Sequence, residues 1–359
     1  MSSVLELARP ELRKLRAYTP GTYEPGHIRL NANESPWRSP GDSTERGLNI
    51  YPPPRPATLR TALAKHYGTK QSQVLITRGS SEAIDVLIRG FCRAGQDNIV
   101  INSPTFDMYR VYAGIQNAEV LSVPLIRQRD FAVDTEALLN TVDENTKIVF
   151  LCSPNNPTGR VIPQDQLEEI CESLAERCLI VIDEAYYEYA QGTGCLELCS
   201  RFEHVVLLRT MSKFVSLAGA RCGALIAAKE IVDFLGIVLP PYTFPTPSIE
   251  LVNEALATDS LQVSQERIAL IKRERKRLAE ALVDVPDVLK VYASDANFLL
   301  IETVDAYRFS EIAHRAGILV RQFGDDPALA NCIRITVGRP KDNDRLLQAV
   351  SGVEHTDEP

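Results

Sequence analysis

Between about residues 58 and 240, short apolar segments alternate with amphipathic ones, and this alternation limits the possible folds more than any other feature. Seven apolar segments are interpreted as strands: QVLITRG, NIVINSP, EVLSVPL, KIVFLCSP, LIVIDEAYYEY, HVVLLRTMSK and ARCGALIAA. Segments such as TLRTALAKHYG, SSEAIDVLIRGFCRAG and PQDQLEEICESLAERC have a helical pattern. Strands without a polar face need helices on both sides. The pattern therefore predicts an α/β fold with a mostly parallel, seven-stranded sheet sandwiched by helices.

The chain divides where this pattern starts and stops. Residues 1–40 are rich in proline and turn formers, and we expect an arm that packs with the small domain. Residues 41–285 are expected to form the large domain, including a long amphipathic linking helix over 261–285. Residues 286–359 mix strand and helix patterns and predict a smaller α+β domain.

Composition excludes several classes of function. A net charge of -8 argues against nucleic acid as a partner, because phosphate backbones need a basic surface. No apolar run approaches the roughly 20 residues that span a bilayer, so no membrane partner is expected. The beginning of the chain lacks an apolar signal core, which predicts a cytoplasmic protein. The eight cysteines include no C-x-x-C pair and the five histidines are scattered, so we expect reduced thiols and no metal.

Polar groups stand at the ends of several predicted strands, where open α/β sheets bind ligands. Ser80 and Ser81 begin a helix and could offer N–H groups to a phosphate, or one of them could be a simple N-cap. Asp183 ends an apolar strand, where a carboxylate needs a cation from a ligand or from a structural ion pair. Lys213, after VVLLRT, could be a desolvated reactive amine or a surface lysine.

Together, the polar groups at the strand ends indicate a ligand site more strongly than any one of them does alone. The segment SPNNPTG (153–159) ends a further strand with two prolines, two asparagines and a glycine, which is more than a turn requires. A phosphate cradle, an asparagine pair, a buried aspartate, and a lysine with nearby hydroxyls and an arginine suit one ligand. That ligand is a phosphorylated, cationic ring bearing an aldehyde.

The sequence resembles the fold-type I pyridoxal-phosphate-dependent aminotransferases, and within them it is similar to the histidinol-phosphate aminotransferases. The motifs that carry the resemblance follow the family's order over nearly the whole chain. They are LNANESP (30–36), YPPPRPATLR (51–60), GSSEAI (79–84), SPNNPTG (153–159), IDEAYYEY (182–189), RTMSKFVSLAGARCG (209–223) and IRITVG (333–338). NPTG alone is only moderately specific, whereas the ordered set is a strong signal.

The resemblance implies pyridoxal 5'-phosphate as the cofactor and assigns roles around its ring. Lys213 matches the lysine that bonds to the cofactor's aldehyde carbon and then moves the proton. Asp183 matches the carboxylate that pairs with the ring nitrogen, and Tyr186 matches a donor to the ring's phenolate oxygen. Phe106 corresponds to the aromatic residue stacked on the ring, where many relatives have Tyr or Trp.

The resemblance also divides the two asparagines of SPNNPTG. Asn156 matches a second donor to the ring oxygen and a substrate contact. Asn155 is expected to support the loop through local hydrogen bonds, while Pro157 fixes the loop's exit and Gly159 allows the turn.

For the cofactor's phosphate, the resemblance implies a cradle of N–H groups, hydroxyls and a guanidinium from Ser80, Ser81, Thr210, Ser212 and Arg221. Tyr51 matches a tyrosine that reaches the phosphate from the neighbouring subunit. The expected working unit is thus a homodimer with a shared active site. The alternative for Tyr51 is a packed tyrosine before a proline turn.

Substrate recognition is expected at Arg334, which matches the arginine that holds the amino-acid carboxylate in most aminotransferases; the phosphate of histidinol phosphate would take this place. Arg321 and Tyr18 match the family's extra phosphate contacts, and the alternative for Arg321 is a surface strand residue. Two guanidiniums suit a dianion better than one carboxylate. The resemblance implies transamination between L-histidinol phosphate and 2-oxoglutarate, which gives imidazole-acetol phosphate and glutamate. An aromatic amino-acid aminotransferase and a phospho-amino-acid decarboxylase remain alternatives on the same fold. A non-enzymatic binding protein is disfavoured, because the whole reactive set is present.

Overall fold

The computed structural model describes residues 4–24, 26–192, 194–324 and 326–352. Its centre is a seven-stranded sheet with the order β1-β7-β6-β5-β4-β2-β3, in which β7 runs antiparallel to both of its neighbours. This confirms the predicted mostly parallel sheet. The strands are β1 (Val74–Thr77), β2 (Asn98–Ser103), β3 (Glu119–Pro124), β4 (Thr146–Cys152), β5 (Leu179–Asp183), β6 (Val205–Thr210) and β7 (Gly223–Ile226).

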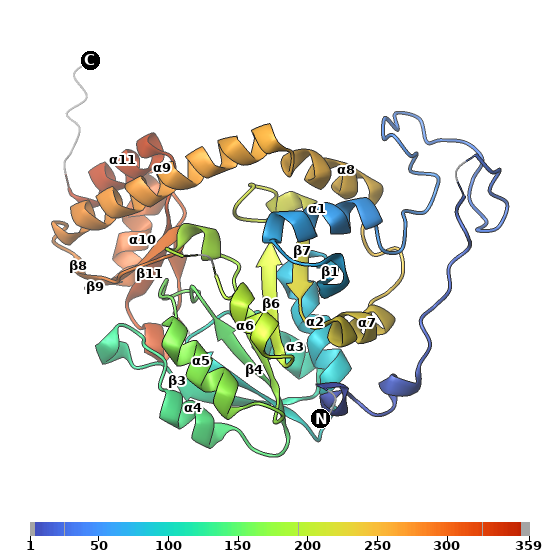
Figure 1. Cartoon of the computed structure of the whole chain (residues 1–359). Helices are drawn as coiled ribbons and strands as arrows, with labels where there is room; N and C mark the ends of the chain where they lie inside the picture. Colours follow the sequence, from blue (N-terminus) through green and yellow to red (C-terminus); the bar gives the residue numbers. More distant parts are fainter. Residues whose placement is uncertain (1–3, 25, 193, 325, 353–359) are drawn as a thin grey trace.

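Helices cover both faces of this sheet (Figure 1). One face packs against α2 (Gly79–Phe91), α3 (Met108–Gln116) and α7 (Lys229–Val238). The other face packs against α1 (Ala57–Tyr67), α4 (Thr135–Thr141), α5 (Gln164–Ser173), α6 (Leu196–Arg201) and α8 (Thr246–Ala255). The central strands are apolar on both sides, so both helical layers are needed to exclude water from them.

One strand is shorter than the sequence predicts. LIVIDEAYYEY was interpreted as a single strand, but β5 ends at Asp183 and a short 3-10 turn follows at Tyr187–Tyr189. The aromatic residues have high β propensity, yet tertiary contacts override it. The Tyr189 hydroxyl donates a hydrogen bond to the Lys213 carbonyl over 3.0 Å, so the turn holds the chain beside the end of β6.

The small domain has its own core. Its antiparallel sheet has the order β10-β11-β9-β8 and packs against α10 (Ala306–Arg315) and α11 (Pro340–Val350). The strands are β8 (Val288–Val291), β9 (Phe298–Thr303), β10 (Arg321–Gln322) and β11 (Cys332–Thr336). The long helix α9 (Thr258–Val283) runs from α8 to this domain, and its Leu278 and Leu282 belong to the small domain's core (Figure 1).

The N-terminal arm packs on the large domain in this structure, whereas the sequence analysis predicts packing with the small one. Val4 and Ala8 are buried in the core cluster beneath α2 and α7. Arg9 donates hydrogen bonds to the Gly90 and Arg89 carbonyls at the end of α2, over 3.1 and 2.9 Å. Beyond this anchor, the arm extends away from the rest of the chain (Figure 1), and Leu30 is 90% exposed. The described helices include none that is long and apolar enough to cross a membrane.

Candidate active site

The predicted reactive residues meet where the parallel strands end. The carboxyl ends of β4, β5 and β6 lie side by side, and the first turn of α2 lies at the same edge. They enclose a cavity of about 170 Å³, called here the inner cavity. Its lining contains every predicted cofactor residue except Tyr51: Ser80, Ser81, Phe106, Asn156, Asp183, Tyr186, Thr210, Ser212, Lys213 and Arg221.

Asp183 is a buried carboxylate without a cationic partner among the described residues. It is 2% exposed, and it accepts hydrogen bonds from the Tyr109 hydroxyl at 2.9 Å and the Ala185 N–H at 3.1 Å. Burial raises the pKa of Asp183 to about 6, and these two donors only partly oppose that effect. The sequence also allowed a structural ion pair at Asp183, and the described residues contain none. A cationic ligand in the inner cavity would complete the site.

Lys213 is a half-buried amine facing other cations. Burial lowers its pKa, and the positive charges of Arg334 and Arg221 lower it further. The Lys213 Nζ lies 5.8 Å from the centroid of the Tyr186 ring. A lowered pKa increases the neutral fraction of the amine, and only the neutral form can attack a carbonyl carbon.

A cradle for a phosphate forms at the beginning of α2. Gly79 has φ +76°, and a Cβ on it would come within 2.9 Å of Arg221 Nη2. Only glycine therefore lets the guanidinium lie over this helix N-terminus, where free N–H groups attract anions. Neither serine acts as an N-cap, because the N-cap is Arg78 and it is bonded to Glu82. This leaves Ser80 and Ser81 free of that role.

Thr210 has a supporting contact within the same cradle. Its hydroxyl oxygen accepts a hydrogen bond from the Ser212 N–H over 3.2 Å and lies 2.9 Å from the Ser212 hydroxyl. It also lies 3.2 Å from the Cys222 carbonyl. Thr210 thus fixes the turn that presents Ser212 and Lys213 to the inner cavity.

The two asparagines after β4 have different surroundings. Asn155 is 7% exposed; its side chain donates to the Pro104 carbonyl and the Thr158 hydroxyl, both at 2.9 Å, and accepts from Thr105 at 2.7 Å. The prediction that Asn155 supports the loop is confirmed. Asn156 instead lines the inner cavity, and its side-chain oxygen accepts a hydrogen bond from Arg334.

A larger, open cleft of about 880 Å³, called here the outer cleft, lies against the inner cavity. The two share four lining residues: Phe106, Asn156, Tyr186 and Lys213. The small domain contributes Arg321 and Arg334, which are paired directly across β10 and β11. A molecule in the outer cleft can therefore contact Lys213 and both guanidiniums together.

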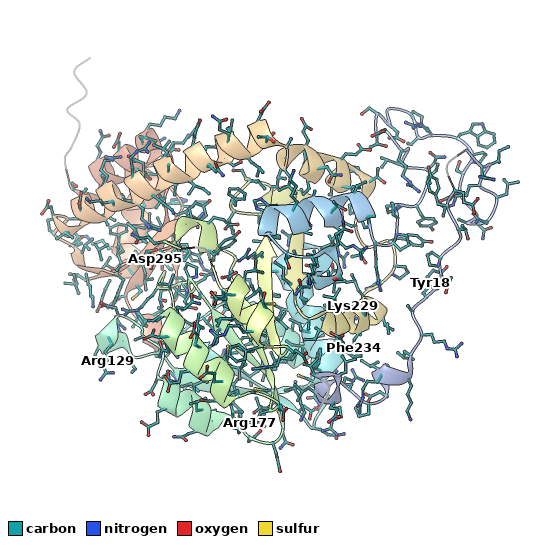
Figure 2. All side chains as sticks on the ribbon, viewed as in Figure 1. Tyr18, Arg129, Arg177, Lys229, Phe234 and Asp295 are labelled. Carbon is teal, nitrogen blue, oxygen red and sulfur yellow. The ribbon has the colours of Figure 1, made fainter. Side chains whose placement is uncertain are left out.

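Two predicted site residues, Tyr18 and Tyr51, lie outside both the inner cavity and the outer cleft. Tyr18 is on the arm, 65% exposed, away from the sheet (Figure 2). Tyr51 is 49% exposed and stacks on Tyr242 with 4.7 Å between ring centroids. Neither lines the inner cavity or the outer cleft. The role of Tyr51, which concerns a neighbouring subunit, and the role of Tyr18 as a contact to the substrate's phosphate both stay predictions.

Sequence reasoning missed one residue of the site, Tyr109. Its hydroxyl is the side-chain donor to Asp183, from a position 74 residues earlier in the chain. It lies in the segment MYRVYAGIQ, where a tyrosine has the pattern of an ordinary core residue. No sequence signal identifies its partner.

The sequence profile described as aminotransferase class I and II matches residues 23–350. The chain belongs to this family. It is 41% identical to the histidinol-phosphate aminotransferase of Xanthomonas axonopodis pv. citri (strain 306) over 353 residues, which cover 97% of each chain. It is 40% identical to that of Xylella fastidiosa (strain 9a5c), over 98% of this chain and 97% of the relative. The structure of the Sinorhizobium meliloti histidinol-phosphate aminotransferase in complex with pyridoxal-5'-phosphate has the same fold. The TM-score is 0.76 at 24% identity, covering 85% of this chain and 82% of that one.

Aminotransferases of this family use pyridoxal 5'-phosphate, and the inner cavity suits that group. Asp183 offers a negative charge for a protonated ring nitrogen, and Arg221 with the start of α2 offers a cradle for the phosphate. When bound, the cofactor supplies an electron-accepting ring that withdraws charge from the substrate's α-carbon.

Proposed function

We propose that this aminotransferase transfers an amino group between L-histidinol phosphate and 2-oxoglutarate, giving imidazole-acetol phosphate and glutamate in histidine biosynthesis. The observation that carries the substrate choice is the cross-strand pair of Arg321 and Arg334 at the outer cleft. The relatives named above are histidinol-phosphate aminotransferases, and this chain matches them over nearly their full length.

Two like charges directly opposite each other in a sheet are unfavourable without an anion. Burial lowers the pKa of Arg334, and the charge of Arg321 lowers it further. Among the described residues, neither arginine forms an ion pair. Arg334 donates a hydrogen bond to the side-chain oxygen of Asn156, and both arginines line the outer cleft, where a ligand can reach them. A phosphate dianion can accept from both guanidiniums, whereas one carboxylate has only one negative charge for the pair.

Each reactive residue then has a task that its position permits. Lys213 lies between the inner cavity and the outer cleft, where it can move a proton to and from the substrate's α-carbon. Asp183 provides a carboxylate in the lining of the inner cavity. Asn156 and Tyr186 line both spaces and can orient the ring oxygen and the substrate together.

The test compares kcat/KM for histidinol phosphate and phenylalanine in Arg321→Ala. A charge-assisted hydrogen bond contributes about 1.5–3 kcal/mol, so the loss for the phosphorylated substrate should be roughly 10- to 100-fold. The loss for phenylalanine should be smaller. Arg315→Ala, which removes an exposed arginine of α10 outside the outer cleft, is the matched control. Equal losses on both substrates would contradict the phosphate assignment and favour an aromatic amino acid.

A second measurement tests the enzyme class itself. Cofactor added to the purified chain should give visible absorbance that Lys213→Ala abolishes, because that variant lacks the amine that bonds to the aldehyde. A chain that stays colourless would contradict the proposed function altogether. A phosphorylated α-amino acid that loses carbon dioxide instead of its amino group would identify the decarboxylase alternative.

The working unit in this proposal is a homodimer with a shared active site. The support is the exposed apolar surface of the arm: Ile28, Leu30 and Trp37 are 88%, 90% and 78% exposed. Burying such residues is favourable, and a second copy of the chain is the partner we propose. Tyr51 and Tyr18 would then reach the neighbour's inner cavity and outer cleft. Sedimentation equilibrium should give twice the chain mass, and Tyr51→Phe should weaken cofactor binding.

Cytoplasmic residence belongs to the same proposal. All eight cysteines are buried free thiols, as expected of a protein kept in a reducing compartment. We also propose the division at about residue 285, since α9 contributes its last turns to the small domain's core.

A further inference from the structure

Tyr109 contacts two residues that line the inner cavity, Asp183 and Phe106. It lies in α3 and is fully buried. Its ring stacks on Phe150 of β4, with 4.6 Å between centroids and 14° between planes. It meets the ring of Phe106 edge to face, with centroids 5.7 Å apart and planes at 88°. Packing on two sides therefore leaves the phenol ring little freedom to turn.

The hydroxyl of this fixed ring is directed at Asp183. Tyr109 Oη donates to Asp183 Oδ2 over 2.9 Å, while Asp183 Oδ1 accepts from the Ala185 N–H over 3.1 Å. Within the part of the chain that the structure describes, each carboxylate oxygen thus has one donor. Because a carboxylate oxygen has two acceptor sites, one site on each remains for the inner cavity.

We infer that Tyr109 is a positioning residue for cofactor binding: its hydroxyl orients the Asp183 carboxylate toward the ring nitrogen, while its ring holds Phe106 against the ring face. The residue acts through Asp183 and Phe106, both of which line the inner cavity, and does not line it itself. One side chain in α3 would thereby hold in place both residues that we expect to contact the cofactor ring.

The hydrogen bond also sets the charge of the carboxylate. Donation to an ionised oxygen favours the ionised form, so the Tyr109 hydroxyl lowers the pKa of Asp183 against the raising effect of burial. Among the described residues, the other titratable groups whose charges act on Asp183 or respond to it are Glu184, Cys152 and Tyr186, while Lys213 and Arg221 line the same inner cavity. The negative charge of Glu184 raises the pKa, and the thiol and the second phenol stay neutral at ordinary pH because burial raises their pKa values. Tyr109 is the side chain that donates to the carboxylate.

The experiment is Tyr109→Phe, which keeps the ring packing and removes only the hydroxyl. In the cofactor-free full chain, carboxyl-¹³C NMR follows the titration of Asp183, with its signal assigned by its absence in Asp183→Asn. The midpoint should rise by about one pKa unit above the wild-type value, since a hydrogen bond to a charged group is lost. The dissociation constant for pyridoxal 5'-phosphate should rise about tenfold.

Tyr112→Phe is the matched control, because it removes another tyrosine hydroxyl from the same helix, outside the inner cavity. It should change neither quantity. An unchanged Asp183 midpoint in Tyr109→Phe would overturn the inference, and so would unchanged cofactor affinity. The inference rests on the cofactor site of the proposed function and not on its substrate. A wrong substrate would therefore leave the titration result intact, whereas a chain that binds no cofactor would fail in wild type as well.

Discussion

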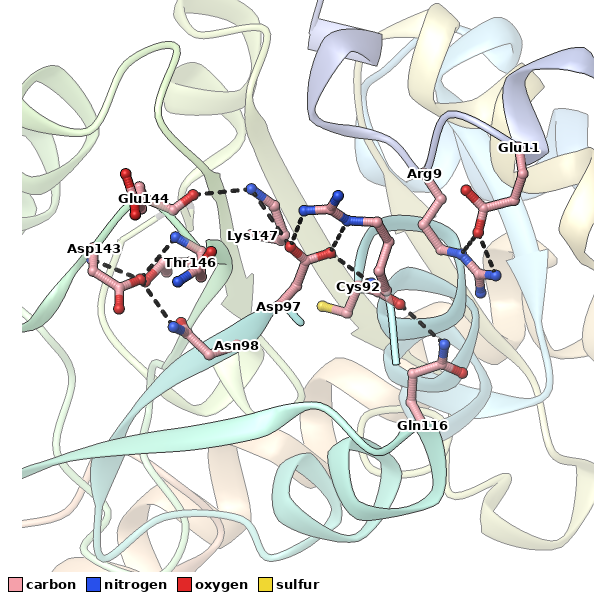
Figure 3. A network of polar contacts seen from close by, with 12 residues as sticks. Arg9, Glu11, Cys92, Asp97, Asn98, Gln116, Asp143, Glu144, Thr146 and Lys147 are labelled. Carbon is pink, nitrogen blue, oxygen red and sulfur yellow. Dashed lines mark hydrogen bonds and ion pairs between the residues drawn. The ribbon is translucent and has the colours of Figure 1, made fainter. Parts of the chain in front are cut away.

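Two buried aspartates at opposite ends of the parallel strands differ in their partners. Asp97 precedes β2 at the amino end and is 1% exposed; Asp183 ends β5 at the carboxyl end and is 2% exposed. Arg93 donates to Asp97 three times, over 2.6, 2.9 and 2.8 Å, and Lys147 lies 3.8 Å away (Figure 3). Asp183, in contrast, accepts hydrogen bonds from one phenol and one backbone N–H among the described residues. The two side chains are similarly inaccessible to water, but Asp183 lies deeper in the protein and lacks the cations that compensate Asp97.

The difference separates a structural carboxylate from a functional one. Burial acts to raise the pKa of Asp97, but Arg93 and Lys147 outweigh it, and the pKa is lowered. Burial prevails at Asp183, and its pKa is raised to about 6. Glu184, the next residue in the chain, follows the structural pattern, because Arg209 donates to it over 2.8 Å. A buried carboxylate that lacks a cation of its own and also lines a cavity, as Asp183 does, is available to a cationic ligand.

The largest effect in this comparison should come from Asp183→Asn. The amide keeps the shape but cannot balance a protonated ring nitrogen, so kcat/KM should fall about 10²- to 10³-fold. The free energy of unfolding of the cofactor-free chain should stay the same or increase, because an uncompensated buried charge is removed. Steady-state kinetics and urea unfolding measure the two quantities. Activity within tenfold of wild type would mean that Asp183 has no functional charge.

Asp97→Asn should show the reverse. The carboxylate's ion pair with Arg93 is lost, and the free energy of unfolding should fall by about 2 kcal/mol. Transamination by the folded enzyme should be unchanged, because Asp97 lies at the far edge of the sheet from the inner cavity. Urea unfolding and kcat/KM on the same preparation test both parts. A loss of activity without a loss of stability would contradict the structural assignment.

The pH dependence of stability should separate the two residues by sign. The folded pKa of Asp183 is raised above its unfolded value, so the folded state binds more protons between the two values. Lowering the pH from about 7 to 5 should then stabilise the cofactor-free wild type by about 1 kcal/mol relative to Asp183→Asn. The contribution of Asp97, with a lowered folded pKa, is complete above its unfolded value and is lost only at lower pH. Urea unfolding across this range checks the slope, and parallel curves for the two proteins would contradict it.

Much of this site follows from sequence because the strands stop on polar residues. Asp183 directly follows an apolar run, and Lys213 comes three residues after the end of β6, so the common edge of the parallel strands brings them together. Asn155 was assigned to loop support by the family's pattern, and its three hydrogen bonds confirm it.

What the sequence could not predict depends on packing between distant segments. The charge balance of Asp183 depends on Tyr109, whose helix carries no mark of that contact. The end of β5 was misplaced because strand propensity favours continuing through Tyr189, while its hydrogen bond to Lys213 requires a turn. The packing of the arm depends on its anchor, because Val4 and Ala8 are buried in the core of the large domain, and no sequence pattern identifies that contact.

The smallest expected effect on the free energy of unfolding comes from Lys147, the second cation near Asp97. Lys147 lies 3.8 Å from Asp97, beyond direct hydrogen-bond distance, and also donates to the Glu144 carbonyl over 3.1 Å (Figure 3). Lys147→Met keeps an unbranched side chain for packing and removes the charge, so the free energy of unfolding should fall by only about 0.5 kcal/mol. A double-mutant cycle with Asp97→Asn isolates the pair. If the coupling equals the whole loss in Asp97→Asn, then Lys147 and not Arg93 compensates the carboxylate. A small coupling would instead show that the three hydrogen bonds from Arg93 compensate Asp97, and Asp183 lacks such a partner among the described residues.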